Sequence, residues 1–166
     1  HEPLPGADEA AAQAQATAVA TRLRALLGST GPEPALEVDA DLRPEGRNGP
    51  LVRTIGSYAE YYERWSSPWE SQALLRARPM AGDPDLCLRF VELVAPLRYP
   101  PGGADAATIK EVRRLKARME AERLPRGVEP ARHLKLGRGG LSDVEWSVQL
   151  LQLRHELLLH RQAGVL

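Results

Sequence analysis

Apolar and charged residues alternate without a break from position 36 to position 43. The apolar positions are Leu36, Val38, Ala40 and Leu42, and the charged positions between them are Glu37, Asp39, Asp41 and Arg43. Successive side chains of a β-strand point to opposite faces, so the pattern predicts a short strand with one apolar and one charged face. The charged face is either a chemical site or the solvated side of an edge strand, and the alternation alone does not decide between them.

Three carboxylates share the charged face of this predicted strand. Neighbours on one face lie roughly 6.5–7 Å apart, so Glu37, Asp39 and Asp41 repel one another unless water, an arginine or a divalent cation compensates. Magnesium prefers such oxygen ligands. One strand cannot complete a two-metal site, and no other segment offers an Asp-x-Asp pair in an extended context. We expect the missing acids to precede His1.

Helical periodicity and helix-start signals cover most of the remaining chain. We predict helices over residues 7–27, 57–65, 68–78, 83–95, 105–123 and 142–160, with two further extended pieces at 51–55 and 133–136. Capping boxes at 57–60 and 142–145 mark two of the helix starts. Pro96 limits the fourth helix. The order indicates an α+β protein that is mainly α, with the boundary between its two parts near residues 55–57.

Composition narrows the classes of partner. The 22 basic and 22 acidic residues cancel, so no overall field draws the protein to nucleic acid or to an acidic membrane surface. No apolar run approaches the roughly 20 residues of a membrane span. Cys87 is the only cysteine, which excludes an intrachain disulfide and fits a reducing compartment, so we expect a cytoplasmic protein. Because the first residue is not methionine, we treat the chain as a segment of a longer protein.

A glycine-rich turn precedes the last predicted helix. Residues 137–140 read GRGG, and Lys135 lies close by in the sequence. Free backbone N–H groups at a helix start, together with Lys135 and Arg138, are able to hold a phosphate. The alternative is a turn that feeds the helix and uses glycine for backbone geometry alone.

The last helix carries polar residues on an otherwise apolar element. Its seam consists of Glu145, Gln149, Gln152 and Glu156. This seam faces either a catalytic cleft or solvent. Asp143 and Glu145 are two residues apart and do not face each other on a helix, so we expect one of them to cap it.

Three sequence motifs, in this order, resemble one enzyme family. They are EVDADLRPEGRNGPLV at 37–52, WESQALLRAR at 69–78 and GGLSDVEW at 139–146. The chain resembles the bifunctional glutamine synthetase adenylyltransferase/adenylyl-removing enzymes over nearly its whole length. The similarity is greatest to actinobacterial members and to their C-terminal, adenylylating half.

The resemblance implies a fold, a domain division and a reaction. It implies the C-terminal part of a polymerase-β-like nucleotidyltransferase sheet at 1–56, followed at 57–166 by an α-helical bundle similar to that of PII uridylyltransferases and incomplete at its C-terminus. The implied reaction is magnesium-dependent transfer of AMP from ATP to a tyrosine of glutamine synthetase. A PII-type signalling protein is a further implied partner, while nucleic acid and membranes are not.

The resemblance also assigns residues. In the family, an upstream Asp-x-Asp motif supplies two metal-binding acids and a later strand supplies the third, which Asp39 matches. The remaining candidates come from the residues themselves and not from the resemblance, and many relatives carry arginine at the position of Asp41. They are Glu37 and Asp41 as supporting metal ligands, Arg43, Lys135 and Arg138 as nucleotide or phosphate contacts, and Glu70, Asp143 and Glu145 as cleft residues. Arg43 alternatively pairs with Asp41 or Glu37. Since the upstream motif is absent, we expect the segment to be inactive alone.

Three other functions stay open on sequence grounds. The homologous half of the same family removes AMP by phosphorolysis with similar motifs. The helical part is also a candidate non-catalytic module that binds glutamine synthetase or a PII-type protein. A related uridylyltransferase is the third alternative, against which the motif at 69–78 argues.

Overall fold

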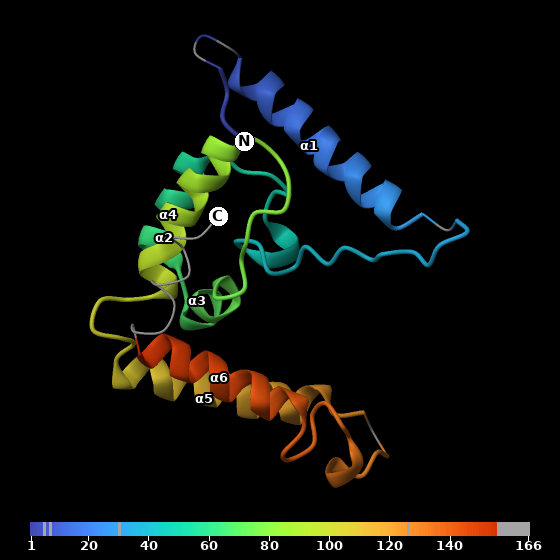
Figure 1. The fold of residues 1–166 in the computed structure, drawn as a ribbon, viewed down its shortest axis with the longest axis vertical. Helices are drawn as coiled ribbons and strands as arrows, with labels where there is room; N and C mark the ends of the chain where they lie inside the picture. The colour runs from blue at the N-terminus through green and yellow to red at the C-terminus, as the bar shows by residue number, and fades with distance from the viewer. Residues whose placement is uncertain (5, 7, 30, 126, 156–166) are drawn as a thin grey trace. The chain divides into compact units, whose positions relative to one another are not determined.

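The computed structural model describes residues 1–155 except residues 5, 7, 30 and 126. Figure 1 shows its helices in chain order. They are α1 (Glu9–Leu27), α2 (Ile55–Trp65), α3 (Pro68–Leu74), α4 (Pro84–Arg98), α5 (Ala106–Arg123) and α6 (Leu141–Arg154), with short 3-10 turns at Gly46–Asn48 and Pro130–Arg132. The prediction of a mainly helical protein is confirmed. No helix in the described part of the chain is long and apolar enough to cross a membrane.

The predicted sheet part is wrong for the described residues, which contain no β-strand. Residues 36–40 have no regular secondary structure, and a turn begins at Asp41 instead of a continuing strand. A strand is stabilised by a neighbour that completes its hydrogen-bond ladder, and alternation alone does not provide that neighbour. Leu36 and Leu42 accordingly stay 62% and 63% exposed. The pieces predicted as extended at 51–55 and 133–136 likewise contain no strand.

The chain forms two compact units that interleave along the sequence. The first comprises residues 1–66 and 79–90, and the second comprises residues 67–78 together with the chain from residue 91 onward. Helix α4 has residues in both units. The assignment of residues 1–56 to a nucleotidyltransferase domain stays a prediction.

Aromatic packing stabilises the first unit. The ring of Tyr58 meets Phe90 edge-on with centroids 5.2 Å apart and stacks on Tyr62 at 5.9 Å, and Tyr62 is buried. Helix α2 begins at Ile55 because the Thr54 hydroxyl accepts a hydrogen bond from the Ser57 backbone N–H at 3.1 Å. The predicted start at Ser57 is therefore wrong, since the cap stands three residues earlier.

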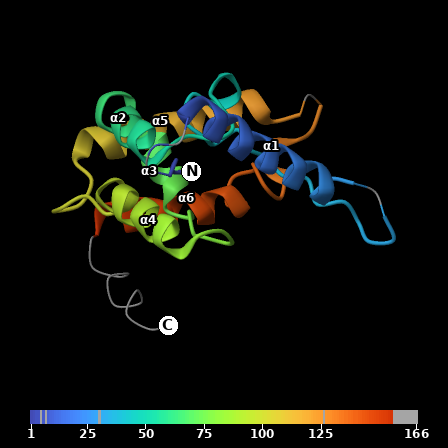
Figure 2. The same ribbon diagram turned by 90° about the horizontal axis from the view of Figure 1, so that it is seen from above.

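An apolar core stabilises the second unit. Helices α5 and α6 lie along each other, as the view in Figure 2 also shows, and both contact α3. Leu75, Val112 and Leu153 form the buried centre. Helix α4 runs through Pro96 to Arg98, so the predicted end before that proline is wrong.

A carboxylate at the third residue of α6 marks the start of that helix. The Gly139 backbone N–H donates to Asp143 Oδ2 at 2.6 Å, and the Ser142 backbone N–H donates to the Lys135 carbonyl at 3.0 Å. The predicted capping box led by Ser142 is wrong, because the N-cap residue is Gly140 and no side chain caps it. Asp143 instead holds the N–H of Gly139, the residue before the N-cap. The predicted continuation over residues 156–160 lies outside the described residues.

Candidate functional site

Asp39 forms a turn with its own backbone. Its Oδ1 accepts a hydrogen bond from the Asp41 N–H at 2.8 Å, which is the geometry of an Asx turn. Its side chain is exposed, and Oδ2 has no hydrogen-bond partner within the described part of the chain. One carboxylate oxygen is therefore fixed by the backbone while the other is free to contact a ligand.

A single guanidinium group clasps the loop that follows, residues 40–49. Arg43 donates from Nη1 to the Ala40 carbonyl at 2.6 Å, from Nε to the Gly49 carbonyl at 3.1 Å and from Nη2 to the Arg47 carbonyl at 3.1 Å. These carbonyls stand at the beginning and the end of the loop. We call this arrangement the Arg43 clasp.

Three further residues shape the backbone of this loop. A Cβ atom added at Gly49 would lie 2.1 Å from the Pro44 carbonyl oxygen, so only glycine allows this close approach. Pro44 is fully buried. Glu45 adopts a left-handed conformation with φ at 62°, which a non-glycine residue rarely occupies.

The other two acids of the predicted face behave differently from Asp39. Asp41 forms an ion pair with Arg47 at 2.6 Å and lies 4.0 Å from Arg43 Nη1, and the hydrogen bond to Asp41 raises the pKa of Arg47. Glu37 is exposed and has no ion pair among the residues that the structure describes. The pairing of Arg43 with Asp41 left open by the sequence is thus present as a long contact.

A magnesium ion needs more oxygen ligands than this segment brings together. Within the described residues, no three acidic, histidine or cysteine side chains are close enough to hold a metal ion. Asp39 offers one free oxygen, whereas Asp41 is engaged by Arg47. These residues do not form a complete metal site by themselves.

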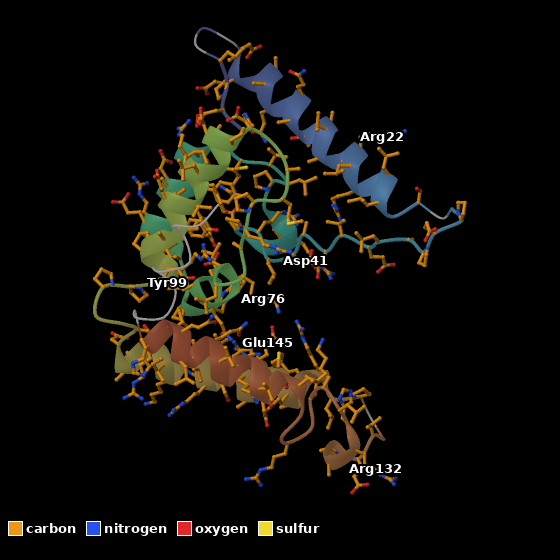
Figure 3. The ribbon with its side chains drawn as sticks, in the orientation of Figure 1. Arg22, Asp41, Arg76, Tyr99, Arg132 and Glu145 are labelled. Carbon is orange, nitrogen blue, oxygen red and sulfur yellow. The ribbon has the colours of Figure 1, made fainter. Side chains whose placement is uncertain are left out.

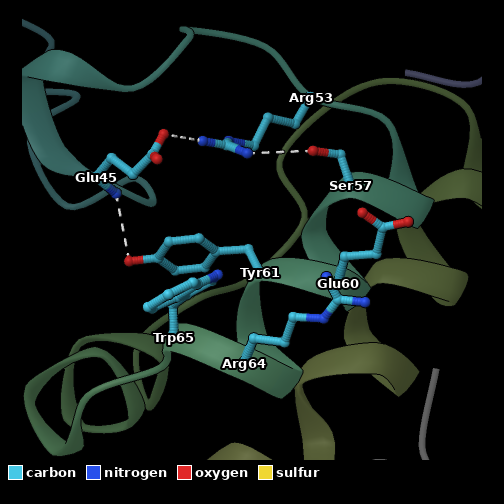
Figure 4. A pocket seen from close by; sticks show the side chains of 7 residues that line it. All are labelled: Glu45, Arg53, Ser57, Glu60, Tyr61, Arg64 and Trp65. Atoms are coloured by element: carbon cyan, nitrogen blue, oxygen red, sulfur yellow. Dashed lines mark hydrogen bonds and ion pairs between the residues drawn. The ribbon is translucent and has the colours of Figure 1, made fainter.

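A small polar pocket of about 170 Å³ lies beside α2, and sequence reasoning missed it (Figure 4). Arg53 forms an ion pair with Glu45, donates to Ser57 Oγ at 3.1 Å and lies over the Tyr61 ring at 5.5 Å. The Glu45 backbone N–H reaches the Tyr61 hydroxyl at 3.4 Å. This network attaches the far side of the loop to α2.

The glycine-rich turn before α6 uses its backbone N–H groups internally. Gly137 donates to the His133 carbonyl at 2.7 Å, Gly140 to the Gly137 carbonyl at 2.8 Å, and Gly139 to Asp143. A Cβ atom at Gly137 would lie 2.3 Å from the Pro130 carbonyl oxygen, so that glycine serves backbone packing. Lys135 and Arg138 are exposed. A phosphate contact there stays a prediction that rests on these two side chains.

Asp143 is tied to α5 as well as to the glycine turn. Its Oδ1 accepts from Lys116 Nζ, which also binds Glu120. The hydrogen bond from Lys116 and that from the Gly139 N–H together lower the pKa of Asp143. Asp143 thus has a structural task that joins two helices and a turn.

The first two members of the polar seam of α6 pair with α3 and with the turn that follows it. Glu145 forms an ion pair with Arg76, and the two are labelled in Figure 3. Gln149 is buried and accepts a hydrogen bond from Gln72 Nε2 at 2.6 Å. The periodicity identified the seam, but only the structure shows its partners. Glu156, its last member, lies outside the described residues.

Glu70 is a buried acid in α3. Its side chain is 3% exposed, and Oε2 accepts from the Ser67 backbone N–H at 2.8 Å. Its Oε1 is buried and has no hydrogen-bond partner in the part of the molecule that is described. The local capping role is clear, and a cleft role stays a prediction.

Comparison with known proteins identifies the family. A model of the glutamate-ammonia ligase adenylyltransferase family matches residues 1–93. The bifunctional glutamine synthetase adenylyltransferase/adenylyl-removing enzyme of Mycobacterium tuberculosis is 61% identical over 154 residues, covering 93% of this chain and 16% of that protein. The enzyme of the same name from Streptomyces coelicolor is 61% identical over 165 residues, covering 99% and 16%.

The chain spans about one sixth of the length of these relatives. The family match extends over more than half of the chain and includes the Asp39 turn, the Arg43 clasp and α2. The chain therefore belongs to the glutamate-ammonia ligase adenylyltransferase family.

Proposed function

We propose that this chain supplies the Asp39 carboxylate to an active site that transfers AMP from ATP to a tyrosine hydroxyl of glutamine synthetase. The names of the relatives support the reaction and its protein substrate. The observation that carries the residue assignment is the Asp39 turn, in which one oxygen is fixed by the backbone and the other is exposed and free of hydrogen bonds among the described residues.

The proposed transfer exchanges one phosphorus–oxygen bond for another. The tyrosine oxygen bonds to the α-phosphorus of ATP, and the bond from that phosphorus to the oxygen bridging to the β-phosphate breaks. Pyrophosphate leaves, and the hydroxyl proton passes to water or a base. Magnesium, when bound, neutralises phosphate charge in reactions of this class. We propose that Asp39 offers one ligand oxygen and that polypeptide outside this chain provides the remaining acids.

The test uses a polypeptide of the relatives' full length that contains this chain. It is incubated with glutamine synthetase and ATP labelled at the α-phosphate, with equally labelled UTP as the matched donor control. We expect label on glutamine synthetase from ATP and at least about tenfold less from UTP, since a site that hydrogen-bonds one base leaves polar groups unpaired with the other. Absence of label from ATP contradicts the adenylylation proposal.

The removing reaction is the second candidate, because the relatives' names include it. In that reaction inorganic phosphate attacks the α-phosphorus, ADP forms and the tyrosine hydroxyl is restored. Both reactions are measured in one polypeptide carrying Asp39→Asn. Selective loss of ATP-dependent labelling assigns this chain to the adenylylating half, whereas selective loss of phosphate-dependent release assigns it to the removing half.

A further inference from the structure

We propose that Arg43 is a positioning residue that aims the Asp39 carboxylate by closing the loop behind it. The inference rests on the proposed function of Asp39 and gives Arg43 a different task from the phosphate contact that the sequence suggested. It follows from the number, position and geometry of the carbonyl groups around the guanidinium.

The clasp occupies Arg43 on each of its nitrogen atoms. Nε, Nη1 and Nη2 all donate to backbone carbonyls at 2.6–3.1 Å, and the side chain is only 17% exposed. Bidentate binding of a phosphate requires two neighbouring N–H groups directed at the same anion. Three of the five N–H donors of Arg43 close the loop, and the side chain is mostly buried, so the observed geometry favours a structural task.

The clasp is connected to Asp39 through one residue. Arg43 Nη1 binds the carbonyl of Ala40, which lies between Asp39 and the Asp41 N–H that holds Oδ1. The Arg43 backbone N–H donates to the same carbonyl at 3.3 Å. The Ala40 carbonyl and the Asp41 N–H belong to the same peptide group, so loss of the guanidinium releases the group whose N–H holds Oδ1. The direction of the free oxygen changes with it.

Lysine cannot reproduce the clasp. The three carbonyls surround a planar group with fixed donor directions, whereas an ammonium is a compact point charge on a flexible stem. Lysine does, however, serve as a phosphate-binding residue. Arg43→Lys therefore separates the two tasks, because it preserves a charge for phosphate and removes the planar donor set that the loop needs.

The experiment compares Arg43→Lys with the parent in the full-length polypeptide, using AMP incorporation at varied free magnesium and at varied ATP. We expect kcat to fall about 10- to 100-fold, as displacement of a reacting group by about 1 Å does. We also expect the magnesium concentration for half-maximal rate to rise at least about threefold, with KM for ATP within about twofold. Arg89→Lys is the matched control, since that exposed side chain pairs only with Glu2 at 3.3 Å among the described residues.

Hydrogen exchange of the same variant gives a readout that does not depend on activity. The Asp41, Gly46 and Gly49 amides all donate within the loop, so we expect them to exchange about tenfold faster in Arg43→Lys while the amides of α2 keep their rates. Faster exchange throughout α2 shows general unfolding, and together with an unchanged magnesium requirement it overturns the positioning role.

Two other outcomes also overturn the inference. A raised KM for ATP with an unchanged magnesium requirement assigns Arg43 to phosphate binding. Parent-like kinetics and loop exchange in Arg43→Lys show that the clasp is dispensable. Asp39→Asn is measured in parallel. Full activity of Asp39→Asn contradicts the proposed function itself. An inactive Asp39→Asn together with a parent-like Arg43→Lys contradicts only the positioning role of Arg43.

Discussion

The loop behind Asp39 and the core of the second unit are stabilised by opposite means. The core is formed by three buried apolar side chains, those of Leu75, Val112 and Leu153. Beside it, the buried side-chain amides of Gln72 and Gln149 form a hydrogen bond with each other. In the loop, the Arg43 guanidinium donates hydrogen bonds to three backbone carbonyls, while Leu42 stays largely exposed. Apolar burial tolerates small movements of side chains, whereas a clasp of directed hydrogen bonds fixes a backbone path. The second arrangement is suited to aiming a carboxylate.

The largest expected effect comes from the centre of the core. Leu153→Ala removes a side chain that is 1% exposed, and we expect the free energy of unfolding to fall by about 2–5 kcal/mol, from lost burial and the cavity left behind. The control is Leu151→Ala, whose side chain is 57% exposed and should cost less than about 0.5 kcal/mol. Urea unfolding measures both. Equal losses from the two variants contradict the assigned core.

The buried amide pair gives the next effect. Gln149→Ala leaves the Gln72 amide without its partner, so we expect a loss of about 1–3 kcal/mol in the free energy of unfolding. The double replacement Gln72→Ala with Gln149→Ala should cost less than the sum of the single changes, because no amide is then left unpaired. Additive losses show that the two side chains do not interact.

In the loop, the matching perturbation is Gly49→Ala. Its Cβ would meet the Pro44 carbonyl oxygen at 2.1 Å, so the loop must open, at a cost of about 1–3 kcal/mol typical of overpacking. Gly31→Ala is the control, since no atom lies within 4 Å of its added Cβ. We expect the amide hydrogen of Gly46 to exchange faster in Gly49→Ala and at the parent rate in Gly31→Ala. Identical exchange in both variants argues against a tightly closed loop.

The smallest effect is a dependence on pH in the second unit. The pKa of Asp143 is lowered in the folded protein by Lys116 and the Gly139 N–H, so its ionised form stabilises the fold at neutral pH. That stabilisation starts to disappear as pH falls below the unfolded value near 4 and is gone below the folded pKa. As the pH is lowered from about 5 to about 2, we expect the Tm of Asp143→Asn to fall less steeply than the Tm of the parent protein. Parallel curves for variant and parent oppose this assignment.

Sequence reasoning found what periodicity encodes and missed what depends on distant partners. Most of the helices and the first members of the polar seam of α6 follow from local spacing, and they are present in the described part of the chain. Alternation at 36–43 was misleading, because a strand also needs a neighbour, which no periodicity supplies. The Arg43 clasp was not visible either, since residue type cannot show whether a guanidinium turns toward carbonyls of its own loop or toward a ligand.

The carboxylate of Asp39 provides the most direct test of the whole account. In the full-length polypeptide, Asp39→Asn is compared with Asp41→Asn by the rate of AMP incorporation into glutamine synthetase. Losing a metal-ligand oxygen costs several kcal/mol of transition-state stabilisation, so we predict at least about a 100-fold loss for Asp39→Asn. For Asp41→Asn we predict at most about tenfold, because Arg47 already engages that carboxylate. A rate for Asp39→Asn within a few-fold of the parent would contradict the account.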